Sequence, residues 1–411
     1  MPHLSRPSAR VLSAAPLSAP RPSSPLTAMM ACCTLLSLSA AASAAPTTTL
    51  AKVSLRPAQL HSVKLVMVGD TGEPPSTEGC GARADGSAPL GASCHASAAQ
   101  REALRAAIVA EQADAIFALG DLVYPKVPAC DGEVDGVKKE LDAVLGDLFA
   151  PAGQRPPPTF LVLGNHDVGH LRGRNPKRER CLMAYAAKHG RVQLPALQYE
   201  VDVGFGKVVV IDSNLRDQDL LPASTVKAAM DNPLSAWTLV LSHHELRTAW
   251  DKELDGFWEP PPPGRWLIDQ GLRPDLWVNG HAHSLQFGVY DARVVDQGRP
   301  VPNAPADPVW VPALTSGAGS KVRPGPSCSD WDQTPGRGAQ IVADRAACKD
   351  AGPRGAPAFA RHQLGYAVVT LSAEQMLVEI KDLGGQRLYC WARTPGDPKG
   401  AVCGAEGTPA P

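Results

Sequence analysis

The sequence predicts an α/β fold, and two features of the chain support that prediction. Short, nearly all-apolar runs recur along it, each followed at once by a small or polar residue, and such runs are typical of strands in a sheet covered on both faces. Helical stretches lie between them, and this alternation indicates a core whose ligands gather beyond the carboxyl ends of the strands. The five runs are Val63 to Gly69, Ala115 to Gly120, Thr159 to Gly164, Trp237 to Ser242 and Asp275 to Gly280.

Local signals define the remaining elements. Ser97 and Gln100 have the spacing of a capping box, which predicts a helix continuing to about Gln112. An apolar face between Val137 and Leu148 predicts a second helix. Three runs joined by short turns predict an antiparallel meander that extends a second sheet; they are Gly365 to Leu371, Met376 to Asp382 and Arg387 to Ala392.

Composition excludes several classes of protein. A hydrophobic content of 44% with 20% charged residues is enough to bury a large core, so the chain is not intrinsically disordered. The formal net charge of -1 provides no basic excess for a nucleic-acid surface. The one apolar run near the length of a membrane span lies close to the N-terminus. We therefore expect no nucleic-acid partner and no membrane span in the mature chain.

The N-terminal segment has the composition of a secretory signal peptide. It contains Arg but no acidic residue, and an apolar stretch ends in Ala42-Ser43-Ala44, which fits a cleavage site. An uncleaved anchor helix is the alternative, and Met29 or Met30 are alternative starts. The expected organisation is a signal peptide over 1–44, a linker over 45–60, one domain over 61–395 with loops at 74–96 and 319–361, and a Gly/Pro-rich tail over 396–411.

The cysteines favour an exported protein. Two of the ten lie in the signal segment, and the other eight are scattered singly through Gly/Pro-rich loops without a C-x-x-C pair. Disulfides in an oxidising compartment fit this pattern best, so we expect a secreted or periplasmic protein. A Cys80–Cys94 disulfide and a Cys328–Cys348 disulfide would each close a short loop. The pairing of the other four cysteines stays open.

Potential metal ligands follow each of the five apolar runs. Any one of these motifs alone fits a turn or a helix cap, but five in succession at strand ends indicate shared chemistry. Carboxylates, an amide and imidazoles suit iron, manganese or zinc, and seven side chains suffice for two ions if Asp121 bridges them. The seven candidates are Asp70, Asp121, Tyr124, Asn165, His243, His281 and His283.

The five motifs resemble those of the calcineurin-like metallophosphoesterases, and specifically the purple acid phosphatases. Most metallophosphoesterases have a metal-binding His two residues after the first Asp, whereas this chain has Gly72 there and Tyr124 three residues after Asp121. That exchange is typical of the purple acid phosphatase branch, and the length is closer to the small, tartrate-resistant type. The resemblance implies a four-layer sandwich of two mixed sheets flanked by helices.

The resemblance also implies how two metal ions are divided among the ligands. Ferric iron would be held by Asp70, Asp121, Tyr124 and His283. A divalent ion (Fe, Zn or Mn) would be held by Asp121, Asn165, His243 and His281. About five positive charges against three anionic ligands would leave a site suited to a phosphate dianion and a hydroxide.

Neighbouring residues are candidates for substrate contacts. His166, next to Asn165, is expected to serve the leaving oxygen as an acid or charge stabiliser, with Asp167 orienting the loop or the ring; a helix-capping role for His166 is the alternative. His244 is a weaker candidate for substrate binding, as are His170 and His189. The basic segment 171–180 could recruit phosphorylated macromolecules, although a solvated loop explains it as well.

These observations predict an exported binuclear phosphatase. It would hydrolyse phosphate monoesters of small molecules or proteins by in-line attack of metal-bound hydroxide. A phosphodiesterase or nucleotide pyrophosphatase would share every ligand. A catalytically silent, metal-stabilised binding protein is a second alternative.

Overall fold

The structure is a computed structural model. It describes residues 50–55, 61–80, 94–130, 134–142, 157–169, 174–215, 223–231, 235–246, 271–295, 299–300, 305–323 and 358–403. The chain divides into two units, Met1–Thr47 and Thr48–Pro411, and all described residues belong to the second. The expected signal peptide, His170, Cys328 and Cys348 lie outside the described residues.

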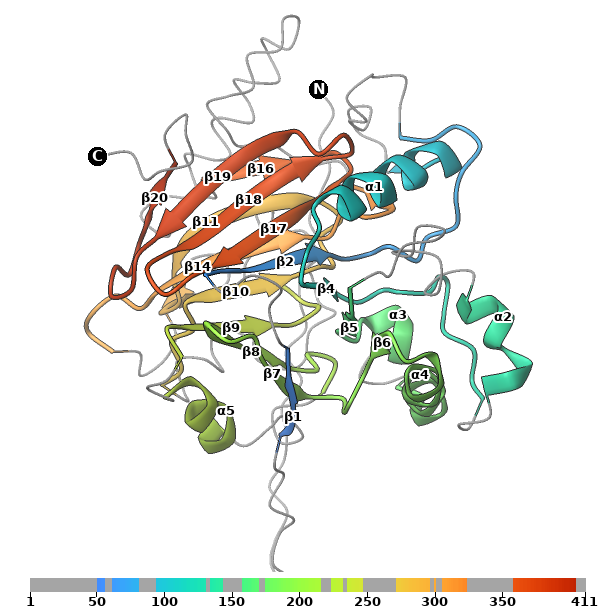
Figure 1. Ribbon diagram of the computed structural model, residues 1–411, viewed down its shortest axis with the longest axis horizontal. Helices are drawn as coiled ribbons and strands as arrows, with labels where there is room; N and C mark the ends of the chain where they lie inside the picture. The colour runs from blue at the N-terminus through green and yellow to red at the C-terminus, as the bar shows by residue number, and fades with distance from the viewer. Residues whose placement is uncertain are drawn as a thin grey trace, which may run out of the picture. The chain divides into compact units, whose positions relative to one another are not determined.

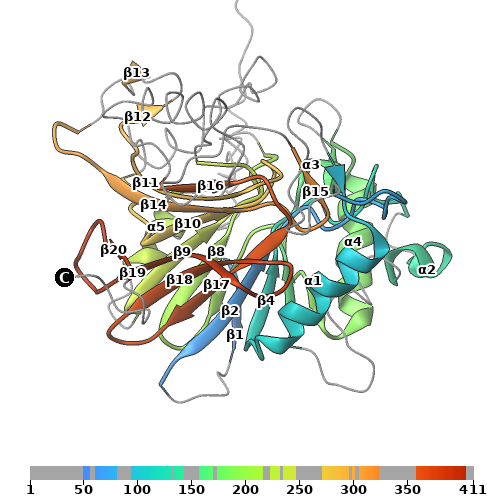
Figure 2. The same ribbon diagram turned by 90° about the horizontal axis from the view of Figure 1, so that it is seen from above.

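Two eight-stranded mixed sheets form the fold, and Figures 1 and 2 show one lying over the other. The first, named here the β2 sheet, has the strand order β20 (Ala401–Val402), β19 (Arg387–Arg393), β18 (Met376–Asp382), β17 (Gly365–Leu371), β2 (Val63–Val68), β4 (Ala115–Ala118), β5 (Thr159–Leu161) and β6 (Val192–Gln193). The second, the β9 sheet, has the order β1 (Ala51–Ser54), β7 (Tyr199–Asp202), β8 (Gly206–Val210), β9 (Trp237–Leu241), β10 (Leu276–Asn279), β14 (Trp310–Ser316), β11 (Leu285–Asp291) and β16 (Phe359–Arg361).

Helices and two small sheets complete the described part. The helices are α1 (Ala98–Ala110), the 3-10 helix η1 (Val134–Gly136), α2 (Lys138–Leu141), α3 (Asn165–Val168), α4 (Pro176–His189) and α5 (Ala223–Met230). The two-stranded sheets pair β3 (Cys94–His95) with β15 (Lys321–Val322) and β12 (Val294–Val295) with β13 (Arg299–Pro300). None of the helices in the described ranges is long and apolar enough to cross a membrane.

Burial on both faces explains the all-apolar strands. In β9, Leu239 and Leu241 join the core that contains residues of both large sheets, whereas Val240 joins a second core with Val226 of α5. Phe287 of the β9 sheet packs against Trp391 of the β2 sheet, with ring centres 4.9 Å apart. The layers are therefore helix, sheet, sheet and helix, which confirms the predicted fold class.

The local predictions are largely confirmed. The Ser97 side chain accepts the Gln100 backbone N–H, and Gln100 returns the bond to the Ser97 backbone, so the capping box is present. The meander has the predicted bounds to within one residue, but it pairs with β2 through β17 and so extends the β2 sheet. The five apolar runs are consequently divided between the sheets, with β9 and β10 in the other one.

The segments expected to be loops contain some strand. β3 and β15 form a small sheet, and β16 joins the edge of the β9 sheet. Short strands paired far along the sequence leave no periodic signal, which is why they were not predicted. The Cys80–Cys94 disulfide is confirmed, and the structure adds Cys130–Cys181 and Cys390–Cys403.

Candidate metal centre

The seven predicted ligands come together at the carboxyl ends of strands from both sheets. The β2 sheet supplies Asp70 after β2 and Asp121 after β4, while Asn165 opens α3 shortly after β5. The β9 sheet supplies His243 after β9, and His281 and His283 after β10. Ligand atoms of Asp70, Asp121 and His243 all lie within 4.8 Å of one another. The centre therefore spans the two sheets.

One half of the centre surrounds the Tyr124 hydroxyl. This hydroxyl donates to Asp121 Oδ2 at 2.6 Å and lies 3.4 Å from Asp70 Oδ1 and 3.2 Å from His283 Nε2. His283 Nε2 is in turn 3.1 Å from Asp70 Oδ1. Both carboxylates and His283 are almost fully buried. These four side chains are the set that the resemblance assigns to the trivalent ion.

The other half surrounds Nε2 of His243. This nitrogen lies 3.3 Å from Asp121 Oδ1, 3.2 Å from Asn165 Oδ1 and 3.1 Å from His281 Nδ1. The other ring nitrogen, Nδ1, lies 2.8 Å from the Leu119 carbonyl oxygen, which can only accept, so Nδ1 carries a proton. Nε2 is thereby directed at the other three ligands. Asp121 contributes one oxygen to each half, as a bridging ligand requires.

The backbone is strained at these residues. Among the described residues, five other than glycine have positive φ angles, and four of them are predicted ligands: Asp70 (56°), Asp121 (52°), His281 (64°) and His283 (49°). This region of φ costs energy for residues with a side chain, and such outliers cluster at functional sites. Packing and hydrogen bonds hold them; Asp70 Oδ2, for example, accepts the His281 backbone N–H at 2.8 Å.

Glycine is sterically required at residue 72. A Cβ there would overlap the Leu122 carbonyl group and the Val123 nitrogen. The Gly72 N–H donates to the Asp121 carbonyl at 3.1 Å, and the Tyr124 N–H donates back to Gly72 at 3.3 Å. The segment that carries Asp121 and Tyr124 therefore lies directly against Gly72.

Electrostatics in the structure favour a cation at this position. Burial alone would lower the pKa of His243, but the neighbouring Asp121 and Asp70 outweigh it and raise that pKa to about 10. Burial would raise the pKa of Asp121, yet His243 holds it well below its usual value. Burial and the two carboxylates also raise the pKa of Tyr124. The buried carboxylates beside His243 therefore favour a positive charge at this position.

Comparison with known families agrees with this site. The sequence profile described as calcineurin-like phosphoesterase matches residues 63–285, a range that includes every predicted ligand. This chain belongs to the calcineurin-like phosphoesterase family. Its two large mixed sheets with few helices are consistent with the fold of this family. A search of curated proteins found no match.

Solved structures of low sequence identity also match this chain. A purple acid phosphatase from yellow lupin (Lupinus luteus) seeds has 16% sequence identity and a TM-score of 0.53, covering 82% of this chain. This chain spans 55% of the lupin enzyme's length. GAP50, described as the anchor in the inner membrane complex of Plasmodium, has 12% identity and a TM-score of 0.46, covering 82% of this chain and 90% of its own. PhoD has 10% identity and a TM-score of 0.49, and the match covers 86% of this chain and 74% of PhoD.

In this phosphoesterase, His166 lies at the edge of the centre. Its side chain is 35% exposed, Nδ1 lies 2.8 Å from the Pro125 carbonyl oxygen, and Nε2 lies 3.9 Å from Asp121 Oδ2. Nδ1 therefore donates to Pro125, which leaves Nε2 directed toward Asp121. The ring packs on Tyr124 with centres 4.2 Å apart.

Asp167 holds the loop rather than the His166 ring. Its two carboxylate oxygens accept the backbone N–H groups of Leu122 and Gly164, each at 2.8 Å. Burial, followed by the nearby Asp121, raises the pKa of Asp167 to about 7. Asp167 thus joins the segments after β4 and β5, which are the segments that carry Asp121 and Asn165.

His244 lies beside the half of the centre that surrounds His243 Nε2, and Ser213 fixes it there. The rings of His244 and His281 have centres 4.6 Å apart, and ligand atoms of His243, His244 and His281 lie within 4.8 Å of one another. Ser213 Oγ accepts the His244 backbone N–H at 3.1 Å and lies 2.8 Å from His244 Nδ1. His189, in contrast, packs against Tyr185 at the end of α4.

Ser213 and its neighbours were not predicted from the sequence. Asp212 accepts from Arg174 at 2.9 Å, and the Asn214 amide donates to the Leu163 carbonyl at 2.9 Å. These residues follow the apolar strand β8, so the same pattern of an apolar run before polar residues was available as a signal. The ion pair between Asp212 and Arg174 also shows that this arginine of the basic segment is neutralised within the fold. Residues 171–173 of that segment lie outside the described ranges.

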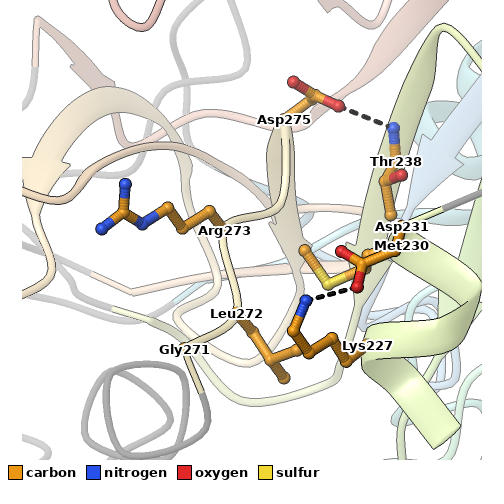
Figure 3. Close-up of a pocket in the computed structure, with 8 residues that line it drawn as sticks. All are labelled: Lys227, Met230, Asp231, Thr238, Gly271, Leu272, Arg273 and Asp275. Carbon is orange, nitrogen blue, oxygen red and sulfur yellow. Dashed lines mark hydrogen bonds and ion pairs between the residues drawn. The ribbon is translucent and has the colours of Figure 1, made fainter. Parts of the chain in front are cut away.

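A pocket of about 200 Å³ lies elsewhere, at the opposite end of β9 and β10 (Figure 3). Its charged residues are largely paired: Asp275 accepts the Thr238 N–H at 2.8 Å and pairs with Arg393 at 2.9 Å, and Lys227 pairs with Asp231. This pocket is separate from the metal ligands, which follow the carboxyl ends of these strands.

Proposed function

We propose that this phosphoesterase hydrolyses phosphate monoesters with a binuclear centre of the purple acid phosphatase type. The donor set fits two ions, because buried carboxylates, imidazoles, a phenol and an amide converge without a thiolate. Asp70, Asp121, Tyr124 and His283 would hold Fe(III). Asp121, Asn165, His243 and His281 would hold a divalent Fe, Zn or Mn ion.

The observation that carries the subclass is the position of Tyr124. Its hydroxyl contacts three of the proposed ligands of the trivalent ion, and the backbone at residue 72 has no space for a side chain. A phenolate is an anionic oxygen ligand and favours a hard, highly charged ion. The likeness to the lupin purple acid phosphatase supports the fold that this proposal uses.

The chain's own residues would bind the substrate and move a proton. Bound metal ions supply Lewis acidity and lower the pKa of a coordinated water. His166 Nε2 would donate a proton or hydrogen bond to the leaving oxygen, with Nδ1 anchored on Pro125. His244, held by Ser213, would contact the phosphate on the divalent side. Asp167 keeps His166 and Asn165 in place through Gly164 and Leu122.

We further propose that the protein is exported. The support is the signal-like composition of residues 1–44 and the three disulfides among the described residues. N-terminal sequencing of protein from its native host would show a mature start near Ala45, and free-thiol titration under denaturing, non-reducing conditions would detect none. Several free thiols would contradict export.

The test of the activity compares p-nitrophenyl phosphate with bis-p-nitrophenyl phosphate. The metal-loaded protein is expected to have the higher kcat/KM for the monoester. Preference for the diester would replace the proposal with a phosphodiesterase on the same scaffold. Stoichiometric metal binding without turnover of either substrate would indicate a silent binding protein.

A further inference from the structure

A lysine on the short strand β15 lies beside the candidate metal centre. Lys321 and Val322 pair with His95 and Cys94 of β3, and Cys94 is linked to Cys80 by a disulfide. Side chains alternate between the two sides of a strand. Val322 is fully buried, and Lys321 is directed instead toward Tyr124, with Nζ 5.5 Å from the centre of its ring.

Lys321 lies at the edge of the centre, against the same tyrosine as His166. Tyr124 contacts both Lys321 and the ring of His166, whose ring centre is 4.2 Å from that of Tyr124. Under the proposed function, His166 serves the leaving oxygen. Any anionic group of the substrate other than the scissile phosphate belongs to its alcohol part, so the ammonium group of Lys321 would find its partner there.

The charge on Lys321 is only partly neutralised. Within the described part of the chain its acidic partner is Glu73, whose Oε2 is 3.6 Å away, which is too long for a direct hydrogen bond. The other oxygen of Glu73 lies 3.1 Å from Nδ1 of His95, so two basic groups share one carboxylate. The Lys321 side chain is 19% exposed, and a charge with restricted access to water attracts an anion more strongly than a free surface lysine does.

The segment that carries Glu73 is held firmly. The Glu73 backbone N–H donates to Ser320 Oγ at 3.1 Å, and Arg101 donates to the Glu73 carbonyl at 3.0 Å. Ser320 Oγ also donates to the Asp70 carbonyl. Because Ser320 precedes Lys321 directly, the lysine is fixed relative to Asp70 in the metal centre.

We propose that Lys321 selects phosphate monoesters whose leaving alcohol carries a second anionic group, such as a carboxylate or another phosphate. This inference rests on the proposed monoesterase function and names the substrate class of that site. A second anion on the alcohol would pair with Lys321 while the scissile phosphate occupies the centre. Glu73 competes for the same ammonium and so limits the preference.

Two substrates that differ in one group test the proposal. Glycerate 3-phosphate and glycerol 3-phosphate differ by a carboxylate in place of a hydroxymethyl group, and the readout is the ratio of their kcat/KM values. Lys321→Met should lower this ratio about tenfold, the effect of one charged hydrogen bond. Lys321→Arg should retain most of it. Glu73→Gln should raise it about threefold, because the competing carboxylate is removed.

The matched control is Lys52→Met. Lys52 lies on β1 at the edge of the β9 sheet and its side chain is 70% exposed, so this change should leave the ratio unaltered. An unchanged ratio in Lys321→Met, or the same fall in Lys52→Met, would overturn the proposal.

The proposal can fail separately from the proposed function. If the wild-type protein hydrolyses neither ester, the monoesterase function fails, but calorimetry on the metal-loaded protein still measures the affinity ratio of the two compounds. A ratio near one in the wild type would contradict the role of Lys321. A ratio well above one that Lys321→Met abolishes would support that role without turnover.

Discussion

Replacing Tyr124 by Phe removes one oxygen and tests both the local energetics and the metal assignment. In the metal-free protein the Tyr124 hydroxyl donates to the buried Asp121 Oδ2 at 2.6 Å. A hydrogen bond to a charged group contributes about 1.5 to 3 kcal/mol. The free energy of unfolding of the metal-free variant should therefore fall by about that amount.

The same change should act on the metal-loaded protein. The trivalent half would lose one of its three anionic ligands, and Gly72 provides no substitute. Retention of that ion should weaken by at least the roughly 10- to 100-fold that losing a hydrogen-bond partner of a metal ligand typically costs. The resemblance to purple acid phosphatases also implies a visible band from the phenolate, which Tyr124→Phe would remove.

Three measurements on the same preparations check this: urea denaturation of the metal-free protein, metal analysis after dialysis, and the visible spectrum. Tyr199→Phe is the control, because its hydroxyl donates to the Leu161 carbonyl within the core and away from the ligands; it should change stability without changing metal content or colour. The reasoning is refuted if active wild-type protein is colourless and iron-free and Tyr124→Phe retains its metals and its activity.

Three further predictions follow from the site and from one ion pair outside it. His243→Ala and Asn165→Ala should each lower divalent metal content and reduce turnover by orders of magnitude while circular dichroism still shows a folded chain; full activity of both would contradict the binuclear centre. His166→Ala should slow alkyl phosphates much more than p-nitrophenyl phosphate, whose leaving oxygen needs little protonation, and equal losses would assign His166 a structural role. Glu111 accepts from Lys381 at 2.7 Å and from Tyr366 at 2.8 Å; burial would raise the pKa of Glu111, but these partners lower it overall. Because that pKa is depressed on folding, the stabilisation is present above the unfolded value near 4.5 and is lost as pH falls through the folded value. Glu111→Gln should therefore cost about 1 to 3 kcal/mol at pH 7 and much less near pH 3 in denaturant titrations, and an equal cost at both would be inconsistent with this ion pair.

The ligands could be predicted from the sequence because each follows an apolar strand. A strand buried on both faces gives a local signal, and its carboxyl end fixes where the next polar residue lies. Asp70, Asp121 and His243 lie close together, as this pattern predicts. The capping box at Ser97 is equally local and was also predicted correctly.

Other features depend on contacts between distant segments. Ser213 follows β8 and positions His244, which follows the neighbouring strand β9, and neither residue type alone indicates that contact. β3 and β15 are two residues long and pair across more than 200 positions, so no periodicity reveals them. The meander was predicted as strands, but its attachment to β2 depends on the pairing of Ala367 with Met67, which the sequence pattern does not specify.

The structure also explains why Gly72 and Tyr124 occur together. A side chain at residue 72 would overlap the Leu122 carbonyl, so a histidine ligand there requires the segment 121–124 to move away. That movement would break the two backbone hydrogen bonds between Gly72 and this segment, and it would withdraw the Tyr124 hydroxyl from Asp121 and His283. In this backbone, a histidine at 72 and a tyrosine ligand at 124 are therefore mutually exclusive. Gly72→His should displace the tyrosine rather than add an eighth ligand, and a crystal structure of that variant with Tyr124 unmoved would contradict the argument.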